Sequence, residues 1–278
     1  MYHLIHDLPE SALVLDLGSG TGSFSYDATR ATVCAIDLLM PVRKPDGPFL
    51  RGSADALPFP DESVDVVICN HTLEHFENVS ASLREIGRVL KPGGALWAAV
   101  PDASTLDDRL YRYLFDGGGH VNRFSFDSFR DLVESEAEVQ AESCKRLYTG
   151  FVYLNPPHPD RLPFYPRKAA LLARVPPRLL RSIIRWLNFA TRWCDRKLKR
   201  NWSLYGYAFS FRKEGKESAG SIKRLEEDHN VCFSCGSGHP TGTLQLRSKF
   251  RGLLRVYDCP ACGEANFYTP TTGLTEPR

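Results

Sequence analysis

The sequence lacks long apolar runs of the kind that cross a membrane. Nowhere do about 18 uncharged apolar residues follow one another, which is the length that a membrane-spanning helix needs. The first residues, MYHLIHDLPESALVLDLG, also lack a basic start followed by an apolar segment, so they do not resemble a secretory signal. We therefore expect a cytoplasmic protein.

Strong compositional bias and internal repeats are missing too. Hydrophobic residues make up 42% of the 278 residues and charged residues 24%, which excludes a disordered chain and leaves enough apolar side chains for a sizeable core. A chain of this length predicts one main domain with a small appendage.

Charge and cysteine are unevenly distributed. Between Arg161 and Arg200, twelve Lys or Arg residues stand against a single acid, Asp195, whereas acids outnumber bases in the rest of the chain. Four cysteines are scattered singly, mainly in apolar surroundings, and are typical of small core residues in a reducing compartment: Cys34, Cys69, Cys144 and Cys194. The other four form two CxxC pairs near the C-terminus, a spacing that suits a metal better than disulfides.

Continuous apolar runs predict strands that are buried on both faces, as in a parallel sheet. These runs lie at residues 12–17, 31–37, 64–70 and 95–100. Two later stretches, residues 139–154 and 202–211, predict two further strands.

Helices are predicted between the strands. Val79, Leu83, Ile86 and Leu90 recur at helical spacing, and residues 92–94 (PGG) are predicted to stop that helix. Residues 126–135 are another helix candidate. Strands that alternate with helices predict an α/β fold with a doubly wound, mostly parallel sheet.

A glycine-rich turn follows the first predicted strand. Gly18, Gly20 and Gly22 allow backbone N–H groups, where the strand meets its helix, to approach a nucleotide-like cofactor without a Cβ in the way. Asp37, about 20 residues from the turn at the end of the second predicted strand, is placed to accept hydrogen bonds from ribose hydroxyls.

Two residues near the turn argue against a dinucleotide. Ser23 stands where a GxGxxG motif needs its third glycine. Asp16 precedes the turn, where a carboxylate attracts the ammonium of an amino-acid-like ligand and repels a pyrophosphate. A cationic sulfonium amino acid fits this site better.

The order of motifs resembles the class I S-adenosylmethionine-dependent methyltransferases, and among them the type 11 branch. VLDLGSGTG looks like their motif I, and GSADALPFP, DESVDVVICNHTLEHF and LREIGRVLKPGG follow in the family's order. The resemblance covers residues 13–101 and implies a Rossmann-like fold.

The resemblance also implies contacts with S-adenosylmethionine. Asp37 would hold the ribose, and the methionine part would be held by Asp16 and by the turn residues Gly18, Ser19, Gly20 and Gly22. The alternative for these glycines is an ordinary strand-to-helix turn.

Further along the motifs, the resemblance implies that Asp55 hydrogen-bonds the adenine amino group and that Ala56 lies beside the ring. Asn70 would border the methyl group, with His71 lining the cofactor pocket. The alternative for Asp55 is a helix N-cap or a turn residue.

His75 and His120 are the candidate general bases, since each follows a strand end or lies in a loop near the expected ligand crevice. A base is useful for an oxygen or nitrogen acceptor but not obligatory. The alternatives are a helix-start residue beside Glu74 for His75 and a turn-shaping loop residue for His120.

The two C-terminal CxxCG knuckles are predicted to bind one structural Zn²⁺. They contain Cys232, Cys235, Cys259 and Cys262 and resemble a zinc ribbon. Four thiolates fill the tetrahedral shell, so no position remains for activating water or substrate. A redox dithiol or a disulfide framework is the alternative.

We therefore expect three parts in the chain. They are an S-adenosylmethionine-dependent methyltransferase domain over residues 1–213 with a basic helical insertion at 156–200, a linker at 214–230, and a four-cysteine zinc ribbon at 231–278. The linker is polar and contains glycine.

Within the insertion, residues 178–200 predict a basic amphipathic helix with two stripes. The apolar stripe contains Leu180, Ile184, Leu187, Cys194 and Leu198, and the basic stripe contains Arg178, Arg181, Arg185, Arg192, Arg196 and Lys199. The simplest interpretation is a helix that docks on the domain and exposes its charged face to solvent. The alternatives are peripheral membrane contact, binding of an anionic acceptor by Arg181 and Arg185, and nucleic-acid contact.

Three functions remain open. The first is methylation of a small-molecule or glycan-type acceptor at an oxygen atom. If the arginines of the insertion cover the acceptor, that acceptor is expected to be anionic. The second is an RNA base methyltransferase that grips RNA through the zinc ribbon and the basic helix. The third is a binding protein that keeps the fold without chemistry.

Overall fold

The computed structural model describes residues 1–41, 43, 45–155, 165–213, 223–225, 228–249 and 251–271. The chain forms two compact units, each assembled from separate stretches of sequence. Unit 1 comprises Met1–Pro101, His120–Lys145 and Tyr207–Leu225, and unit 2 comprises Asp102–Gly119, Arg146–Gly206 and Glu226–Arg278.

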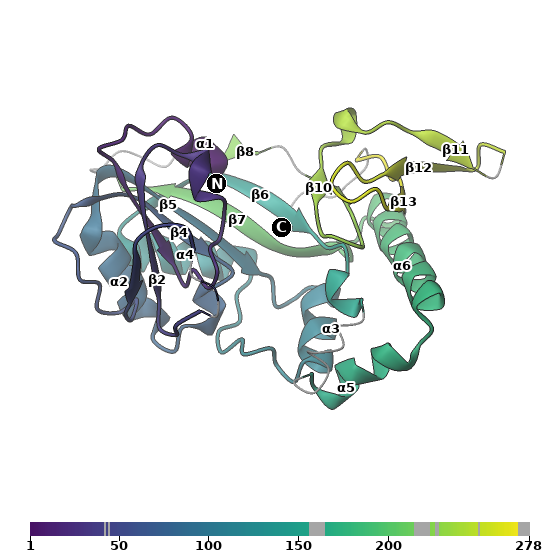
Figure 1. Ribbon diagram of the computed structural model, residues 1–278, viewed down its shortest axis with the longest axis horizontal. Helices are drawn as coiled ribbons and strands as arrows, with labels where there is room; N and C mark the ends of the chain where they lie inside the picture. The colour runs from purple at the N-terminus through teal and green to yellow at the C-terminus, as the bar shows by residue number, and fades with distance from the viewer. Residues whose placement is uncertain are drawn as a thin grey trace. The chain divides into compact units, whose positions relative to one another are not determined.

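Eight strands form one sheet in the order β3-β2-β1-β4-β5-β7-β6-β8 (Figure 1). Its strands are β1 (Leu13–Leu17), β2 (Thr32–Asp37), β3 (Phe49–Arg51), β4 (Val64–Asn70), β5 (Leu90–Pro101), β6 (Gln140–Tyr148), β7 (Leu204–Arg212) and β8 (Lys223–Arg224). The pairs β3-β2, β2-β1, β1-β4 and β4-β5 are parallel, which confirms the predicted mostly parallel α/β sheet.

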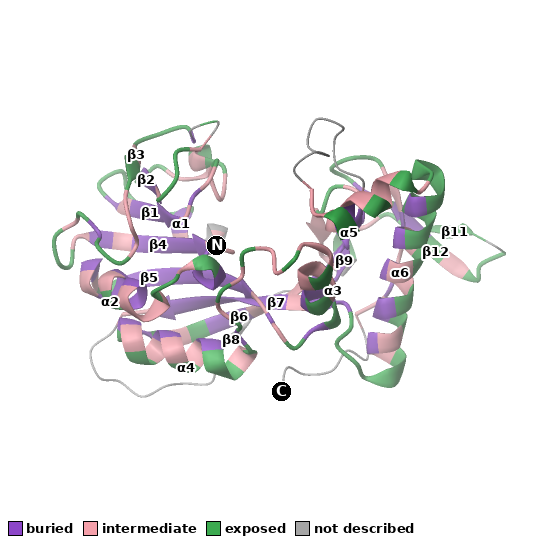
Figure 2. Cartoon of the chain, turned by 90° about the horizontal axis from the view of Figure 1, so that it is seen from below, coloured by how far each residue is buried: buried purple, intermediate pink, exposed green. Residues whose placement is uncertain are grey.

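The core of unit 1 is the middle of this sheet. Figure 2 shows that β1, β4 and β5 are buried along most of their length, which is expected because most of their side chains are apolar. Parallel pairing brings the carboxyl ends of β1, β2 and β4 to one edge. The glycine turn, Asp37 and Asn70 therefore come together although they are far apart in the sequence.

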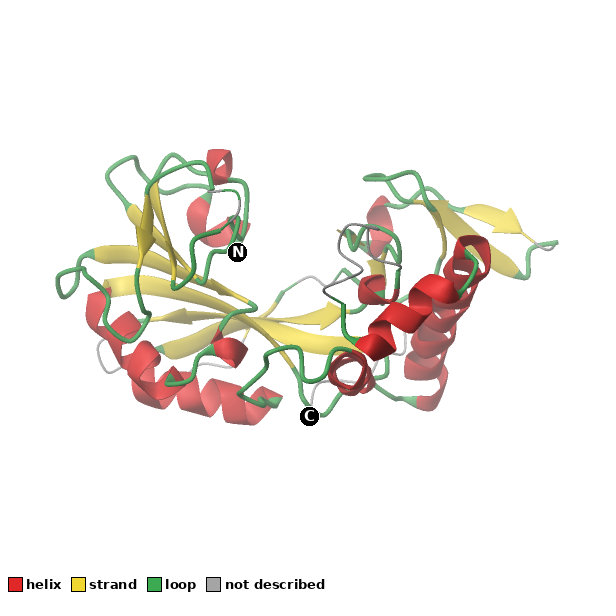
Figure 3. Cartoon of the chain, turned by 60° about the horizontal axis from the view of Figure 1, so that its bottom comes forward, coloured by secondary structure: helices red, strands yellow, loops and turns green. Residues whose placement is uncertain are grey.

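Two helices of unit 1, α2 (Val79–Val89) and α4 (Phe126–Ala137), lie along the same side of the sheet (Figure 3). They pack closely: a Cβ on Gly87 would lie 2.4 Å from the carbonyl oxygen of Ala137. Asn78 caps the start of α2, and Ser125 forms a capping box with Ser128 at the start of α4. A one-turn helix, α1 (Tyr2–Ile5), precedes β1.

The structure corrects the sequence prediction at three connections. No α-helix follows the glycine turn: β1 connects to β2 through the turn and a 3-10 helix, Tyr26–Ala28. Helix α2 ends at Val89, one residue early, and residues 92–94 belong to β5, which is irregularly paired there. The late strand predicted at 139–154 ends at Tyr148 and is followed by a 3-10 helix, Val152–Leu154.

Unit 2 contains the predicted helical insertion and the cysteine module. Its elements are α3 (Leu106–Leu114), α5 (Arg167–Ala170), α6 (Pro177–Leu198), β9 (Asn230–Val231), β10 (Gly238–His239), β11 (Arg247–Lys249), β12 (Leu254–Asp258) and β13 (Ala265–Phe267). The insertion and the module share one apolar core, formed by Phe151, Leu154, Leu180, Ile184 and Phe233.

These units divide the chain differently from the predicted domains. The insertion groups with the cysteine module and with α3, which the sequence did not predict. Part of the predicted linker, β8, pairs with β6 in the sheet. Residues 156–164 of the insertion, 214–222 and 226–227 of the linker and 272–278 of the ribbon lie outside the described residues.

Among the described residues, no helix is both long enough and apolar enough to span a membrane.

Candidate functional site

The glycine turn at the end of β1 depends on left-handed backbone angles. Gly18, Gly20 and Gly22 have φ values of 61°, 51° and 109°, which side chains with a Cβ rarely adopt. At Gly18 an added Cβ would also lie 1.8 Å from Oγ1 of Thr72. The turn therefore requires glycine at position 18 for packing as well as for conformation.

The space over the turn is open to a ligand. Apart from Gly20 itself and its two chain neighbours, no described residue has an atom within 4 Å of the position that a Cβ would take on Gly20. The Oγ of neighbouring Ser19 is buried and has no hydrogen-bond partner among the described residues. A buried hydroxyl without a partner is costly, so a ligand that hydrogen-bonds Ser19 fits this turn.

Asp16 is fully buried in β1, and its carboxylate is held by two residues that follow the turn. Ser23 donates from its backbone N–H (2.8 Å) and its hydroxyl (2.6 Å), and the Tyr26 hydroxyl donates at 2.8 Å. Burial raises the pKa of Asp16, and the hydrogen bonds from Ser23 oppose that shift. Asp16 thus organises the turn segment, and its contact with a ligand ammonium stays a prediction.

Asp37 lies at the carboxyl end of β2, directly beside the turn. Its Oδ2 accepts a hydrogen bond from the backbone N–H of Gly20 at 2.9 Å, and Oδ1 accepts from Leu39 at 2.9 Å. The structure therefore brings Asp37 and the glycine turn together, as the sequence predicts.

Asp55 and Ala56 are both exposed in the loop after β3. This loop is anchored to α2, because Leu57 donates its N–H to Glu85 (2.8 Å) and accepts a hydrogen bond from Arg88 (3.0 Å). The hydrogen bond from Arg88 lowers the pKa of Glu85 and keeps that anchor charged.

Asn70 ends β4, and His71 turns the chain out of the sheet. His71 has a φ of 53°, unusual for a residue other than glycine, and its N–H bonds to the carbonyl of Ala99 at 2.9 Å. Its Nδ1 lies 3.6 Å from Oε1 of Glu74. Both residues predicted to contact the cofactor are thus at the same edge of the sheet as the glycine turn.

The two predicted bases lie side by side. The ring centroids of His75 and His120 are 4.9 Å apart in an edge-to-face arrangement. Glu74, in the same 3-10 helix as His75 (Leu73–His75), offers a carboxylate oxygen to this pair, and the three ligand atoms lie within 4.8 Å of one another. The sequence named both histidines but did not predict that they meet.

The loop that carries His120 is tied to the segment around His75 by hydrogen bonds. The N–H groups of Val121 and Asn122 both donate to the carbonyl of Glu74, at 2.9 and 3.0 Å. The Asn122 side chain donates to the carbonyl of Phe76 at 2.7 Å. These contacts hold together residues that are separated by more than 40 positions.

Comparison with known families identifies this region. Residues 15–98 match the model of a family described as a methyltransferase domain. The matched stretch contains the glycine turn, Asp37 and the end of β4. Residues 15–98 of this chain are therefore similar to a methyltransferase domain.

Two relatives illustrate the similarity of this methyltransferase domain. The malonyl-[acyl-carrier protein] O-methyltransferase of Methylococcus capsulatus is 34% identical over 153 residues, covering 50% of this chain and 54% of that protein. The demethylmenaquinone methyltransferase of Chlorobaculum tepidum is 35% identical over 146 residues, covering 46% and 60%. The chain thus spans little more than half the length of these relatives.

Solved structures agree on the fold. The crystal structure of a protein assigned as a methyltransferase of an antibiotic biosynthesis pathway in Anabaena variabilis superposes with a TM-score of 0.51 at 18% identity, covering 76% of this chain and 93% of that one. This likeness supports the Rossmann-like methyltransferase fold.

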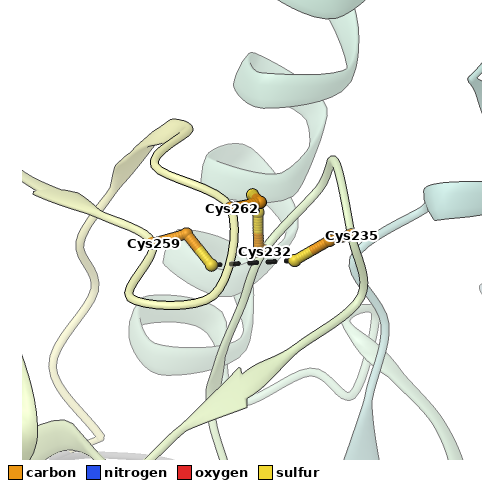
Figure 4. Close-up of side chains that lie close together, drawn as sticks. All are labelled: Cys232, Cys235, Cys259 and Cys262. Atoms are coloured by element: carbon orange, nitrogen blue, oxygen red, sulfur yellow. Dashed lines mark hydrogen bonds between the residues drawn. The ribbon is translucent and has the colours of Figure 1, made fainter.

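Outside the methyltransferase domain, the four cysteines of the CxxC pairs converge (Figure 4). The Sγ atoms of Cys232 and Cys262 are 3.7 Å apart, and those of Cys235 and Cys259 are 3.6 Å apart. Thiolates about 2.3 Å from a tetrahedral metal ion are about 3.8 Å from one another. The cluster therefore has the dimensions of a tetrahedral metal site.

Polar groups surround the sulfurs. The Ser234 N–H and the Asn266 side chain each donate to Sγ of Cys232 at 3.4 Å. His239 places Nε2 3.2 Å from Sγ of Cys259. Such contacts stabilise thiolate charge and orient metal ligands. His239 lies outside both CxxC pairs, so the motif alone did not indicate it.

Helix α6 docks on this cysteine module. Arg181 and Arg185 both form ion pairs with Glu264, and the Arg185 pair has a distance of 2.7 Å. The ring of Trp186 lies 4.7 Å from that of Phe267 in β13. The two arginines proposed to bind an anionic acceptor are therefore already paired with a carboxylate.

The prediction that Arg192 belongs to a solvent-exposed arginine stripe of α6 is wrong, because Arg192 is buried. Arg192 donates hydrogen bonds to the carbonyls of His229 (2.7 Å), Thr149 (2.8 Å) and Asn188 (3.2 Å). Burial lowers its pKa to about 10. Leu198, assigned to the apolar stripe, is instead exposed.

Proposed function

We propose that this protein transfers the methyl group of S-adenosylmethionine to an oxygen atom of a small-molecule or glycan-type acceptor. The observation that carries the proposal is the open glycine turn in the stretch that matches a methyltransferase domain. The turn is flanked by Asp37 and by the Ser19 hydroxyl, for which the described part of the chain offers no hydrogen-bond partner. Small movements of Asp37 would free its carboxylate for the ribose hydroxyls.

The chain's own residues would contribute mainly by position. In the reaction a sulfur–carbon bond breaks as an oxygen–carbon bond forms on the opposite side, the sulfonium becomes a neutral thioether, and the hydroxyl proton leaves. Alignment of the two reactants is worth up to about 7–11 kcal/mol. We propose that His75 or His120, whose rings lie side by side, accepts this proton, and a positioned base contributes on the order of 10²–10⁴-fold.

Oxygen as the acceptor atom is supported by one relative, which is named as an O-methyltransferase acting on malonyl-[acyl-carrier protein]. An anionic acceptor held by α6 has less support, because Arg181 and Arg185 pair with Glu264 and Arg192 is buried. The same pairing removes charge from the face that an RNA methyltransferase would need.

We further propose that the four cysteines hold a structural Zn²⁺, which the sulfur separations and the surrounding N–H groups support. Its role would be to stabilise unit 2. The cytoplasmic location and the peripheral membrane contact of α6 stay predictions.

The test is methyl transfer from labelled S-adenosylmethionine into fractionated cell extract by the full-length, zinc-loaded protein, with Asp37→Asn as the matched variant. We expect label in small molecules or glycans, and binding of S-adenosylhomocysteine weakened about 10- to 100-fold in the variant by the loss of charged hydrogen bonds. Label only in RNA would favour the alternative function. Absence of both label and binding would overturn the proposal.

A further inference from the structure

Three potential metal ligands meet at the carboxyl end of β4. Glu74, His75 and His120 each present one ligand atom, and these atoms lie within 4.8 Å of one another. Two imidazoles and one carboxylate form a donor set that suits divalent first-row transition metals. This cluster belongs to unit 1 and is separate from the cysteine cluster.

Glu74 is the least expected member of the cluster. Its side chain is only 2% exposed, yet Oε2 has no hydrogen-bond partner among the described residues. Its other oxygen lies 3.6 Å from Nδ1 of His71, which is too long for a strong hydrogen bond. A buried carboxylate with an unsatisfied oxygen is costly unless a cation neutralises it.

The positions of the three ligands are built into the fold. Glu74 and His75 occupy one 3-10 helix, and the loop of His120 is hydrogen-bonded to the carbonyl of Glu74 through Val121 and Asn122. The loop therefore cannot move away from that helix without breaking two backbone hydrogen bonds. Preorganised ligands lose little entropy when an ion binds.

We infer that Glu74, His75 and His120 bind a divalent first-row metal ion at the acceptor side of the methyltransferase site. Ligand atoms about 2.1 Å from an ion are about 3.0–3.4 Å apart, so side-chain rotations that shift each atom by about 1 Å would close the site. Three protein ligands leave coordination positions for water or for an oxygen of the acceptor.

This inference adds a role for a metal ion to the proposed methyl transfer. That catalytic role rests on the proposed function, whereas metal binding itself does not. A bound divalent ion lowers the pKa of a coordinated hydroxyl and stabilises the oxygen anion that attacks the methyl group. In this mechanism His75 and His120 hold the ion instead of accepting the proton, so the hydroxyl proton passes to solvent, and no oxidant or reductant is needed. The acceptor would then be an alcohol, an enol or a phenol rather than an amine.

Metal binding is tested without any methylation assay. Manganese(II) is titrated into full-length protein whose cysteine site already holds Zn²⁺, and the loss of the aqueous Mn²⁺ electron paramagnetic resonance signal measures binding. We expect His75→Ala and His120→Ala each to weaken binding at least tenfold, since each removes a ligand. His6→Ala removes an exposed histidine of unit 1 that pairs with Asp7, and we expect it to change nothing.

A second measurement uses only the unaltered protein, so its result does not depend on whether the variants fold. Cobalt(II) added to the zinc-loaded protein should produce weak d–d bands of nitrogen and oxygen ligation without the intense thiolate charge-transfer band. The inference is overturned if Mn²⁺ binds the unaltered protein no more tightly than the His75→Ala/His120→Ala double variant, or if no such cobalt bands appear. Because neither readout involves methyl transfer, this failure is distinguishable from failure of the proposed function.

Discussion

A Cβ at position 18 would occupy space that the Thr72 side chain fills, whereas a Cβ at position 20 would point into the open space over the turn. The two glycines share a left-handed backbone and differ in what surrounds them. Packing cost and conformational cost can therefore be separated by experiment at these two positions.

We expect Gly18→Ala to destabilise the protein by on the order of 3 kcal/mol or more, since strain and overpacking add. Gly20→Ala should cost only about 1–2 kcal/mol, the strain of a left-handed alanine. Urea unfolding followed by circular dichroism measures both. Equal losses in the two variants would show that the contact with Thr72 does not matter.

A second residue-scale feature is Asp107 in α3, which is buried and accepts a hydrogen bond from the Tyr153 hydroxyl at 3.1 Å. Burial raises the pKa of Asp107 to about 6 from its ordinary value of 3.8. The folded state therefore favours the protonated carboxyl. The protonated Asp107 carboxyl contributes fully to the free energy of unfolding below about pH 4, and this contribution is lost as pH rises towards about 6.

We therefore expect the free energy of unfolding of the unaltered protein to lose about 1.4 kcal/mol per pH unit from this group between about pH 4 and pH 6. Asp107→Asn should remove that slope while keeping an acceptor for Tyr153. The measurement is the difference in unfolding free energy between the two proteins from about pH 4 to about pH 8, in which the common zinc contribution cancels. A difference independent of pH would contradict the raised pKa.

Among the elements, helix α6 joins the insertion to the cysteine module by different contacts along its length. Leu180 and Ile184 enter the apolar core of unit 2, Arg185 pairs with Glu264, and Arg192 bonds three backbone carbonyls. The helix therefore carries both apolar and polar contacts with the rest of unit 2.

The polar part of this docking is tested by Arg192→Met, with the exposed Arg178→Met as its control on the same helix. Loss of Arg192 leaves buried carbonyls without donors, so we expect a destabilisation of about 3–5 kcal/mol. Arg178→Met should stay within about 0.5 kcal/mol of the unaltered protein. Thermal unfolding compares the two, and similar midpoints would refute the role assigned to Arg192.

In the whole molecule, the predicted cofactor residues belong to unit 1 and the four cysteines belong to unit 2. The metal of the cysteine site should therefore matter for the stability of unit 2 far more than for cofactor binding. Binding of structural zinc contributes about 10–16 kcal/mol in small zinc domains.

We expect a chelator, or Cys232→Ser, to remove the bound zinc and to make unit 2 susceptible to proteolysis in residues 226–271. The dissociation constant of S-adenosylhomocysteine should stay within about threefold, because no predicted cofactor contact is in unit 2. Mass spectrometry of the fragments and calorimetry provide the two readouts. A protease-resistant unit 2 without metal would contradict the structural role of zinc.

Local patterns were sufficient for the strands β1, β2 and β4, for helices α2 and α4 and for the methyltransferase motifs, since apolar periodicity and turn residues are properties of neighbouring positions. The spacing of the two CxxC pairs likewise predicted that the four cysteine side chains lie close together. Helix α3 was missed although Thr105 and the acids after it are typical of a helix start.

Contacts between distant positions were decided only by the tertiary structure. The meeting of His120 with Glu74 and His75, and the burial of Arg192 against the carbonyls of Thr149 and His229, leave no periodic trace in the sequence. Each depends on which strand ends and loops become neighbours, because long-range packing and hydrogen bonding override local charge and propensity.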